Sequence, residues 1–391
     1  MADPWLTIIG IGEDGPAGLT PASREALLRA EMILGGPRHL DLVGAGARGQ
    51  AWPVPFDLAP VLALRGRAVV VLASGDPFWF GAGGSLMPHL APGEWVSHPE
   101  VSSFQLAANR LGWRLEEVHC LGLHAAPFAR LRPVLGRGVR VISTLRDGAA
   151  VAGLAVWLGE NGHPDAVLWV LERLGGPGER VRRLDHGERA PAAAPVLVAI
   201  EATNPGLSRA SGLPDDIFAH DGQITKRPVR ALTLSALAPR AGEVLWDIGA
   251  GSGSVGIEWL LAGGALVQAV EADPVRAARV RDNAAGFGLA HRHHVTEARA
   301  PEGLAGLPAP DAVFVGGGAS AALLERLWAV MPGGCRLVLN AVTLETEALV
   351  LDWSARHGGD LLRIELAEPA AIGTRRGWRS ALPILQWSVT R

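Results

Sequence analysis

The segment Val244–Gly256 constrains the fold more than any other part of the chain. It reads Val-Leu-Trp-Asp-Ile-Gly-Ala-Gly-Ser-Gly-Ser-Val-Gly, an apolar run that ends in closely spaced glycines. Glycine adopts backbone conformations that other residues avoid, so such a loop can turn sharply from a strand into a helix and approach a ligand closely. The segment therefore predicts an open α/β sheet with a ligand on its loop. The candidate ligand-binding residues are Gly249, Ala250, Gly251, Ser252 and Gly253.

Two acidic residues narrow the choice of ligand. Glu271 lies 18 residues after Gly253, at the end of the next apolar run, where a carboxylate can accept hydrogen bonds from both ribose hydroxyls. That position suits NAD and S-adenosylmethionine equally. Asp247 lies at the end of the apolar run, two positions before Gly249. There it would repel a pyrophosphate but attract the ammonium group of S-adenosylmethionine. We therefore expect S-adenosylmethionine as the cofactor, the alternative being a glycine turn that only joins strand to helix.

The remaining pattern alternates between strand-like and helix-like segments in both halves of the chain. Such alternation predicts mostly parallel α/β sheets. In the first half we expect strands over 5–12, 67–73, 139–144, 166–171 and 195–201, and helices over 20–30, 83–90, 101–111 and 149–159. In the second half we expect strands over 243–248, 265–271, 311–315 and 335–341, and helices over 228–238, 254–261, 274–286 and 319–331. Runs 361–366 and 382–389 predict an antiparallel pair at the sheet edge, joined by a turn-rich segment.

The length of the chain implies more than one domain. At 391 residues it exceeds the usual size of a single domain. Residues 205–216 are rich in turn formers and lack apolar periodicity, which is typical of a linker. We therefore expect one domain over residues 1–204 and a second over residues 217–391.

A second set of turn motifs occurs in the first half. Ser-Gly-Asp-Pro at residues 74–77 follows an apolar run, so its side chains are expected at the carboxyl end of a strand, where ligands bind in α/β folds. Gly10 and Gly12 end the first apolar run, followed by Leu-Thr-Pro at residues 19–21. Ser102 and Ser103 open a helix.

These motifs together resemble two known families. Gly-x-Gly, Leu-Thr, Ser-Gly-Asp-Pro and Ser-Ser-Phe resemble the tetrapyrrole (precorrin) methylases. Gly-Gln-Ile-Thr-Lys-Arg-Pro-Val-Arg from Gly222, ahead of the second glycine loop, resembles the decarboxylating precorrin methyltransferases. The implied fold class is an N-terminal tetrapyrrole-methylase-type α/β domain followed by a Rossmann-like class I S-adenosylmethionine-dependent methyltransferase domain.

The resemblance also implies an activity in cobalamin biosynthesis. The first domain would methylate a precorrin of the precorrin-6B type at C5. The second would methylate C15 and remove the C12 acetate carboxyl as carbon dioxide, giving precorrin-8. The residues that would hold the two donor molecules by this resemblance are Gly75, Asp76, Pro77, Ser102 and Ser103 in the first domain, and Thr225, Asp247, residues 249–253, Glu271, Arg299 and Ala300 in the second. Where the first family often has Leu-His-Gly-Arg, this chain has Leu-His-Ala-Ala at residues 123–126.

Several residues, most of them with polar side chains, are candidates for contact with a substrate rich in carboxylates. Cations are natural partners for such groups. The candidate residues are Gly10, Gly12, His124, Lys226, Arg227, Asn340, Thr343 and Glu345, with Arg375, Arg376 and Arg379 more typical of solvated surface cations. Glycines at 316–318 are equally consistent with a flexible turn and with a shallow floor for a flat substrate. No general acid or base can be assigned from the pattern.

Composition excludes several other classes of protein. Hydrophobic residues make up 48% and charged residues 19%, with a net charge of −3, which is typical of a globular chain and not of one that coats nucleic acid. No apolar stretch is long enough for a membrane span, and the N-terminus lacks a signal sequence, so we expect a cytoplasmic protein without membrane or nucleic-acid partners. The histidines at 291–294 lack the spacing of a zinc site, and we expect no metal.

Two alternative functions stay open at this point. The chain could be a two-domain RNA methyltransferase, since both folds also act on RNA. It could also have one catalytic half and one half that only carries the tetrapyrrole. We expect a homo-oligomer, because the members of both families that the chain resembles are usually homo-oligomeric.

Overall fold

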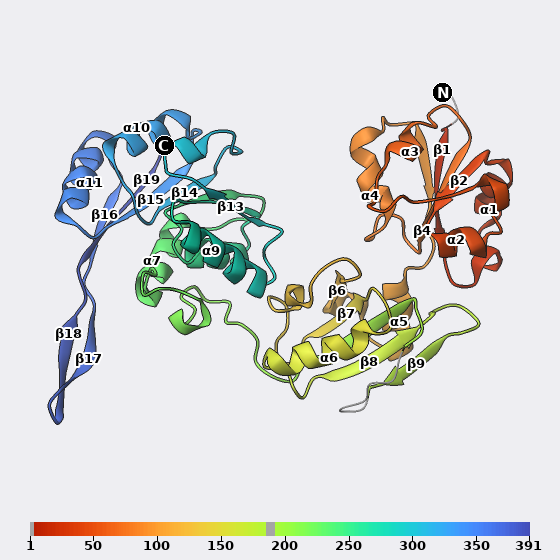
Figure 1. The fold of residues 1–391 in the computed structure, drawn as a ribbon, viewed down its shortest axis with the longest axis horizontal. Coiled ribbons are helices and arrows are strands. Elements are labelled where there is room, and N and C mark those ends of the chain that lie inside the picture. Colours follow the sequence, from red (N-terminus) through yellow and green to blue (C-terminus); the bar gives the residue numbers. More distant parts are fainter. Residues whose placement is uncertain (1–3, 185–191) are drawn as a thin grey trace. The chain divides into compact units, whose positions relative to one another are not determined.

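The computed structural model describes residues 4–184 and 192–391. Its contacts divide the chain into two units, of which the first comprises Met1–Phe128 and Val134–Gly206. The second comprises Ala129–Pro133 and Leu207–Arg391. Figure 1 shows the elements of both units along the chain.

The first unit contains a parallel sheet with helices on both faces. Its strands follow the order β3-β2-β4-β1-β5. They are β1 (Leu6–Ile11), β2 (Met32–Gly35), β3 (Gly49–Ala51), β4 (Val69–Ser74) and β5 (Trp95–His98). The helices are α1 (Pro21–Arg29), α2 (Pro37–Leu42), α3 (Ala59–Leu62) and α4 (Ala82–Leu86). Successive β1 residues enter opposite cores: Ile9 packs beside Leu27 of α1, and Ile8 beside Val61 of α3 and Leu86 of α4.

A second sheet in the same unit has the order β6-β7-β10-β8-β9. Its elements are β6 (Val118–Gly122), β7 (Arg140–Thr144), β8 (Val167–Glu172), β9 (Arg180–Arg183), β10 (Val196–Glu201), α5 (Ser103–Leu111) and α6 (Ala150–Glu160). Only β6 and β7 pair in parallel, whereas β10 is antiparallel to both β7 and β8. The expectation of a mostly parallel arrangement is wrong for this sheet. No helix is described between β8 and β10, and parallel neighbours need a long crossover.

The second unit has one seven-stranded sheet of order β13-β12-β11-β14-β15-β19-β16. Its strands are β11 (Val244–Ile248), β12 (Leu266–Glu271), β13 (His293–Glu297), β14 (Ala312–Val315), β15 (Arg336–Ala341), β16 (Asp360–Ile364) and β19 (Ile384–Thr390). The helices are α7 (Arg227–Leu237), α8 (Ser254–Leu261), α9 (Pro274–Gly286), α10 (Ala321–Val330) and α11 (Leu344–His357). One apolar core joins the sheet to α7, α8 and α9, and another joins it to α10 and α11.

The tail departs from its expected structure in two respects. β16 and β19 form the expected antiparallel pair, but the segment between them is a hairpin of β17 (Ala367–Ile372) and β18 (Arg375–Ser380). Figure 1 shows this hairpin projecting beyond the sheet of its own unit. Helix α11 was also not expected from the sequence. The Thr343 hydroxyl caps it by accepting the N–H of Thr346 at 3.3 Å.

A buried ionic network fastens the segment before α7 to the second unit. Arg230 is fully buried and donates to Glu258 at 2.6 Å and to Asp215 at 2.9 Å. Glu258 also accepts the backbone N–H groups of Gly212 and Leu213. Leu213 is itself buried in the core of the second unit. The last residues of the expected linker are therefore packed on the second unit rather than free.

Candidate functional site

The glycine loop of the second unit lies between β11 and α8, as its sequence predicts. Gly249, Gly251 and Gly253 all have positive φ angles, of 68°, 61° and 74°. A Cβ atom on Gly249 would lie 2.9 Å from the backbone nitrogen of Gly317, in the turn after β14. The two turns therefore approach each other closely only because residue 249 has no side chain.

Glu271 holds this loop from the end of β12. Its side chain is 7% exposed. One carboxylate oxygen accepts the Gly251 N–H at 2.8 Å and the other accepts the Asp273 N–H at 3.0 Å. Each oxygen has a second lone pair. The carboxylate can therefore accept further hydrogen bonds from a ligand without losing its hold on the loop.

Asp247 lies behind the loop and does not line the cavity. Its side chain is 1% exposed and accepts the Gly256 N–H of α8 at 3.2 Å. Burial raises the pKa of its carboxyl to about 7, the Gly256 hydrogen bond opposes the shift, and the charge of Glu271 adds to it. The direct contact with a ligand ammonium that its sequence position suggested is not formed by this geometry. In the free protein Asp247 instead joins β11 to the start of α8.

The raised pKa predicts how Asp247 affects stability. Between about pH 4 and pH 7 the folded chain keeps a proton that the unfolded chain, with the usual carboxyl pKa of 3.8, has released. Stability of the second unit should therefore fall as pH rises through this window, by up to about 1.4 kcal/mol per pH unit. Asp247→Asn should remove this slope and stabilise the unit at neutral pH. Urea unfolding from pH 4.5 to 8 measures both effects, and an unchanged slope in the variant would contradict the assignment.

A cavity of about 490 Å³ lies over the glycine loop. The residues expected from the sequence that line it are Thr225, Lys226, Gly249, Ala250, Gly251, Ser252, Glu271, Arg299, Ala300 and Asn340. Gly316, Gly317 and Gly318 also line it, so the three glycines belong to its wall. Expected residues outside the lining are Arg227, Asp247, Gly253, Thr343 and Glu345. Arg375, Arg376 and Arg379 lie on β18 of the hairpin, also outside this lining.

Physical reasons place some of these residues outside the lining. Gly253 caps α8, and a Cβ there would lie 2.7 Å from the side chain of Val280. Thr343 and Glu345 form the cap and first turn of α11. Helix α11 was not predicted from the sequence, although Thr343 is a good helix-capping residue and several apolar residues follow it. Their place after the strand expected over 335–341 made residues 343 and 345 candidates for substrate contact, whereas in the structure they begin a helix.

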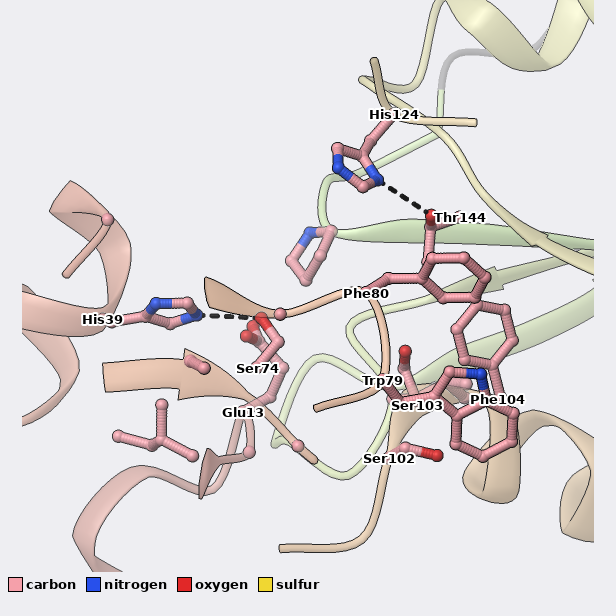
Figure 2. Close-up of a pocket in the computed structure, with 18 of the residues that line it drawn as sticks. Glu13, His39, Ser74, Trp79, Phe80, Ser102, Ser103, Phe104, His124 and Thr144 are labelled. Atoms are coloured by element: carbon pink, nitrogen blue, oxygen red, sulfur yellow. Dashed lines mark hydrogen bonds between the residues drawn. The ribbon is translucent and has the colours of Figure 1, made fainter. Parts of the chain in front are cut away.

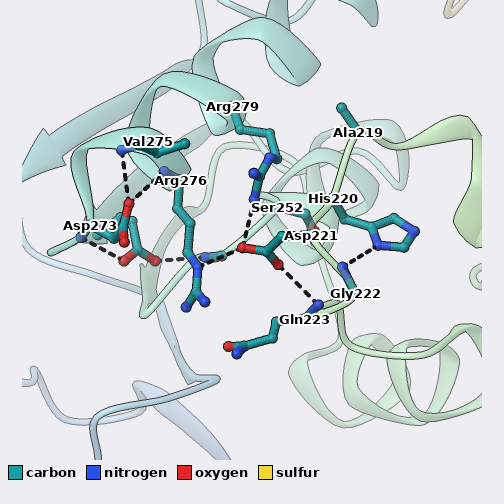
Figure 3. Close-up of polar contacts among 12 residues, drawn as sticks. Ala219, His220, Asp221, Gly222, Gln223, Ser252, Asp273, Val275, Arg276 and Arg279 are labelled. Atoms are coloured by element: carbon teal, nitrogen blue, oxygen red, sulfur yellow. Dashed lines mark hydrogen bonds and ion pairs between the residues drawn. The ribbon is translucent and has the colours of Figure 1, made fainter.

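A segment before α7, Ala219–Lys226, forms one side of the same cavity through its residues Gln223 to Lys226. We call this segment the strap. Figure 3 shows how α9 holds it: Asp221 accepts from Arg276 and pairs with Arg279, both at 3.0 Å, and also accepts the Gln223 N–H. The Gln223 N–H and then the two arginines hold the pKa of Asp221 well below its usual range. The strap is therefore fixed by ionised groups at any pH near neutral.

A further contact fixes the start of the strap. The side chain of Asn283, on α9, accepts the Ala219 N–H and donates to the Ala219 carbonyl, both at 2.9 Å, and it also donates to the Ser252 carbonyl at 2.8 Å. Asn283 is 7% exposed. One side chain thus ties the strap to the glycine loop. The sequence did not indicate these contacts, because they join residues 31 and 64 positions apart.

If the cavity holds S-adenosylmethionine, as the glycine loop predicts, Asp221→Asn should weaken its binding about tenfold. The neutral amide loses both ion pairs, so the strap loses order in the free protein and binding must restore it. Isothermal titration with S-adenosylhomocysteine measures the change. Asp352→Asn is the matched control, because Asp352 forms an exposed ion pair with Arg356 on α11, outside the cavity lining. Equal affinities of Asp221→Asn and the unaltered chain would contradict this role for the strap.

The first unit contains a second cavity of about 490 Å³, lined by residues from both of its sheets. The expected residues Gly12, Gly75, Ser102, Ser103 and His124 line it, whereas Gly10, Asp76 and Pro77 do not. Figure 2 shows Trp79, Phe80 and Phe104 together at one side of this cavity. The rings of Trp79 and Phe104 stack with centroids 5.1 Å apart. These flat apolar groups suit a large conjugated ligand.

Gly10 and Asp76 shape this cavity without lining it. A Cβ on Gly10 would lie 1.8 Å from the carbonyl oxygen of Gly75, so residue 10 must be glycine for β1 to meet the turn after β4. Asp76 closes the turn, as its side chain accepts the Phe78 N–H at 2.8 Å. Pro77 is buried within the same turn. The Ser-Gly-Asp-Pro motif is therefore a turn whose backbone, at Gly75, faces the cavity.

A polar cluster in this cavity was missed by the sequence analysis. Arg38 forms an ion pair with Glu13 and donates to the imidazole Nε2 of His39 at 2.8 Å. His39 Nε2 is also 2.9 Å from the Ser74 hydroxyl, a contact drawn in Figure 2. Burial and then the charge of Arg38 lower the pKa of His39 to about 4, so the imidazole is neutral at physiological pH. Nothing in the local pattern around residues 38 and 39 distinguishes them from a surface helix.

His124 lies at the opposite side of this cavity and contacts the Thr144 hydroxyl at 3.3 Å (Figure 2). The two alanines that follow it, in place of the family's Gly-Arg, bring no cation to this position. Within residues 4–184 and 192–391, no group of three or more histidine, cysteine or acidic side chains is arranged to hold a metal ion. In the same residues, no helix is long and apolar enough to cross a membrane.

Comparison with models of protein families shows which class of protein each unit belongs to. Residues 5–189 match the family of Tetrapyrrole (Corrin/Porphyrin) Methylases, and residues 216–391 match the Precorrin methyltransferase domain. The second match covers the whole lining of the second cavity, and the first covers the lining of the first cavity except Pro195, Val196 and Leu197. The chain is thus a fusion of two methyltransferase units.

Relatives that match along the whole chain define the family. A Sinorhizobium protein named precorrin-6Y C(5,15)-methyltransferase [decarboxylating] is 46% identical over 403 residues, covering 100% of this chain and 97% of the relative. A protein of the same name from Mycobacterium tuberculosis (strain CDC 1551 / Oshkosh) is 39% identical, covering 99% and 100%. The solved C-terminal domain of the Rhodobacter capsulatus precorrin-6Y C5,15-methyltransferase is 52% identical, covering 47% of this chain and 100% of that one, with a TM-score of 0.46. This chain belongs to the family of decarboxylating precorrin-6Y C5,15-methyltransferases.

Proposed function

We propose that this chain transfers two methyl groups from S-adenosylmethionine to one precorrin, at C5 and C15, and releases the C12 acetate carboxyl as carbon dioxide. The product would be precorrin-8. Two observations support the proposal. Relatives named precorrin-6Y C(5,15)-methyltransferase [decarboxylating] match the whole chain, and each unit has its own cavity beside a glycine turn. The first unit would methylate C5, and the second would methylate C15 and decarboxylate.

The contacts of Glu271 are the main support for S-adenosylmethionine as the cofactor of the second unit. Glu271 already holds the Gly251 N–H and keeps free lone pairs at the cavity, where the two ribose hydroxyls of the donor can bind. The adenine would lie along the backbone of Arg299 and Ala300, and the methionine portion near Thr225 and the glycine loop. Asp247 would contribute its charge from beneath the loop, because a cation in the cavity favours its ionised form.

In the first unit, the turn at Gly75 and the start of α5 would hold the donor. Ser102 caps α5 through its side chain, which accepts the Gln105 N–H, and Ser103 follows it at the cavity wall. The aromatic group formed by Trp79, Phe80 and Phe104 would contact the flat face of the tetrapyrrole. Gly12 and His124 would lie beside the substrate.

The chemistry requires mainly positioning. The bridging carbon of a conjugated pyrrole system is nucleophilic and attacks the methyl carbon. A carbon–carbon bond forms, the carbon–sulfur bond breaks with its electron pair on sulfur, and the bridging carbon then loses its proton to solvent. Holding the two reactants in line can lower the barrier by about 7–11 kcal/mol. This explains how the cavities could act without an activated side-chain nucleophile.

Substrate carboxylates would bind the second unit through Lys226 and Asn340, which line its cavity. The three glycines at 316–318 would form a floor that a flat macrocycle can approach. Arg227 and the first turn of α11, with Thr343 and Glu345, lie outside the lining and would at most contact groups at its rim.

We further propose that the chain forms a homo-oligomer in the cytoplasm. An isolated two-stranded hairpin is marginally stable in water, yet β17 and β18 form one with Ile372 66% exposed and Trp378 76% exposed. A second copy of the chain would cover these side chains. The two cysteines are unpaired, which suits a reducing compartment.

The proposal is tested by incubating the full chain with S-adenosylmethionine and reduced precorrin-6B. Mass spectrometry should find a product that has gained two methyl groups and lost one carboxyl, with one carbon dioxide released. Methylation of RNA in place of the precorrin would support an RNA methyltransferase instead. A product with a single added methyl would support the alternative in which one unit only carries the substrate.

A further inference from the structure

Three polar side chains form a buried group directly behind the cavity of the second unit. Asn340 on β15 lies opposite Gln386 on β19 in the sheet register, and Thr233 of α7 packs over both. Thr233 is fully buried and Gln386 is 3% exposed. Asn340 is partly buried and lines the cavity, as do Val229 of α7 and Ile384 of β19. The group therefore extends from the core of the unit to the cavity wall.

The hydrogen bonds within this group define the orientation of the Asn340 amide. Gln386 donates its two N–H groups, one to the Asn340 carbonyl oxygen at 2.9 Å and one to the Thr233 hydroxyl at 3.1 Å. Asn340 donates one N–H to the same hydroxyl at 3.0 Å. An asparagine amide has two N–H groups. The second N–H of Asn340 has no partner in this group, and the residue borders the cavity.

The placement of Gln386 and Thr233 is costly unless their hydrogen bonds are kept. Burial removes the contacts of a polar group with water, which costs free energy unless hydrogen bonds within the protein replace them. Apolar residues such as Val338 occupy the same face of the sheet elsewhere and have no such cost. A fully connected polar group of this kind fixes the orientation of each member. Apolar residues at 233 and 386 would fill the space but would leave the Asn340 amide free to rotate. Thr233 and Gln386 therefore differ from apolar residues at these positions in that they fix the orientation of the Asn340 amide.

We propose that Asn340 binds the substrate carboxyl group that leaves as carbon dioxide, and that Thr233 and Gln386 are positioning residues that aim its free N–H. This inference rests on the proposed function, and it assigns the decarboxylation to a specific place in the cavity. In the step, the bond between the acetate methylene and the carboxyl carbon breaks. Its electron pair enters the conjugated ring, carbon dioxide leaves, and the methylene carbon takes a proton from solvent to become a methyl group.

A neutral donor suits this step better than a cation. Negative charge moves away from the carboxylate as the bond breaks, so a cation bound to it would stabilise the starting state more than the transition state. A single N–H from a fixed amide can hold the carboxylate at the angle needed for cleavage with less of this penalty. The exposed, flexible side chain of Lys226 lines the same cavity and cannot fix such an angle.

The test measures carbon dioxide release and methylation at each position separately, using the full chain. Gln386→Leu and Thr233→Val should lower kcat for carbon dioxide release about 10- to 100-fold. Affinity for S-adenosylhomocysteine and methylation at C5 should stay unchanged. Thr233→Ser keeps the hydroxyl group, so this variant should release carbon dioxide at close to the rate of the unaltered chain. Gln268→Leu is the matched control, because Gln268 is 8% exposed in β12 and lies outside the cavity lining.

A double variant separates positioning from a purely structural role. If Gln386 acts through Asn340, then Asn340→Ala with Gln386→Leu should release carbon dioxide no more slowly than Asn340→Ala alone. Additive losses, or losses that follow thermal stability and occur equally in C5 methylation, would overturn the inference. An unaltered chain that releases no carbon dioxide would instead overturn the proposed function itself.

Discussion

Gly75→Ala is expected to abolish methylation at C5, with a loss of at least about 100-fold, while the second unit keeps its donor affinity. Gly75 has a φ angle of 56°, and a Cβ there would lie 2.6 Å from the Cα of Ser102. Backbone atoms cannot yield as a flexible side chain would, so the turn after β4 and the start of α5 must separate. Both line the cavity of the first unit. The position of the added methyl group, determined by NMR of the product, measures the effect.

The control for this variant is Gly44→Ala. Gly44 has a φ angle of 61°, but a Cβ there has no atom within 4 Å. The Gly44→Ala variant therefore has similar backbone strain without a steric clash, and it should methylate C5 at the normal rate. C5 methylation by Gly75→Ala at the rate of the unaltered chain would show that the turn does not hold the donor.

Gly249→Ala is expected to have the converse effect and to remove C15 methylation. A Cβ on Gly249 would lie 2.8 Å from the carbonyl oxygen of Gly317 and 2.9 Å from its nitrogen, at a φ angle of 68°. The glycine loop would move away from the turn after β14, and both belong to the cavity wall. A loss of at least about 100-fold at C15 is expected, with the donor affinity of the first unit unchanged. Isotope transfer from labelled donor, followed by NMR of the product, gives the rate at each carbon.

Gly242→Ala is the matched control in this unit. Its φ angle is 86°, and a Cβ there has no atom within 4 Å. Normal C15 methylation is expected of this variant. Should Gly249→Ala and Gly242→Ala behave alike, the close approach to Gly317 would have no part in the reaction.

The two glycine turns were predictable from the sequence because their chemistry is local. A strand followed by Gly249, Gly251 and Gly253, or by Ser-Gly-Asp-Pro at residues 74–77, requires nothing distant to be interpreted. The strands and helices around them were also found within a few residues, since apolar runs and capping residues mark them. Glu271 was placed for the same reason, as it ends the strand after the loop.

The parts that the sequence did not predict depend on contacts between distant residues. The strap is held by Arg276 and Arg279, which look like surface cations on α9, and Asn340 is oriented by Gln386 from the next strand. Asp247 was correctly placed at the end of its strand. The direction of its side chain, toward α8 rather than the cavity, is a property of the packing that no local pattern encodes.

The hairpin formed by β17 and β18 was interpreted as a turn-rich segment for a related reason. Its strands carry a proline, a glycine and several exposed charges, a composition that resembles a loop. Apolar alternation marks a strand only where one face is buried in its own chain. Neither strand of this hairpin has a buried residue, so the usual signal is absent.

Titration of the full chain with S-adenosylhomocysteine in a calorimeter tests the central claim most directly. If each unit holds its own donor, the unaltered chain binds two molecules, and Gly75→Ala and Gly249→Ala each bind one. A single molecule per unaltered chain at saturation, or the same stoichiometry in both variants and the unaltered chain, would contradict an enzyme with two separate methyl-transfer sites.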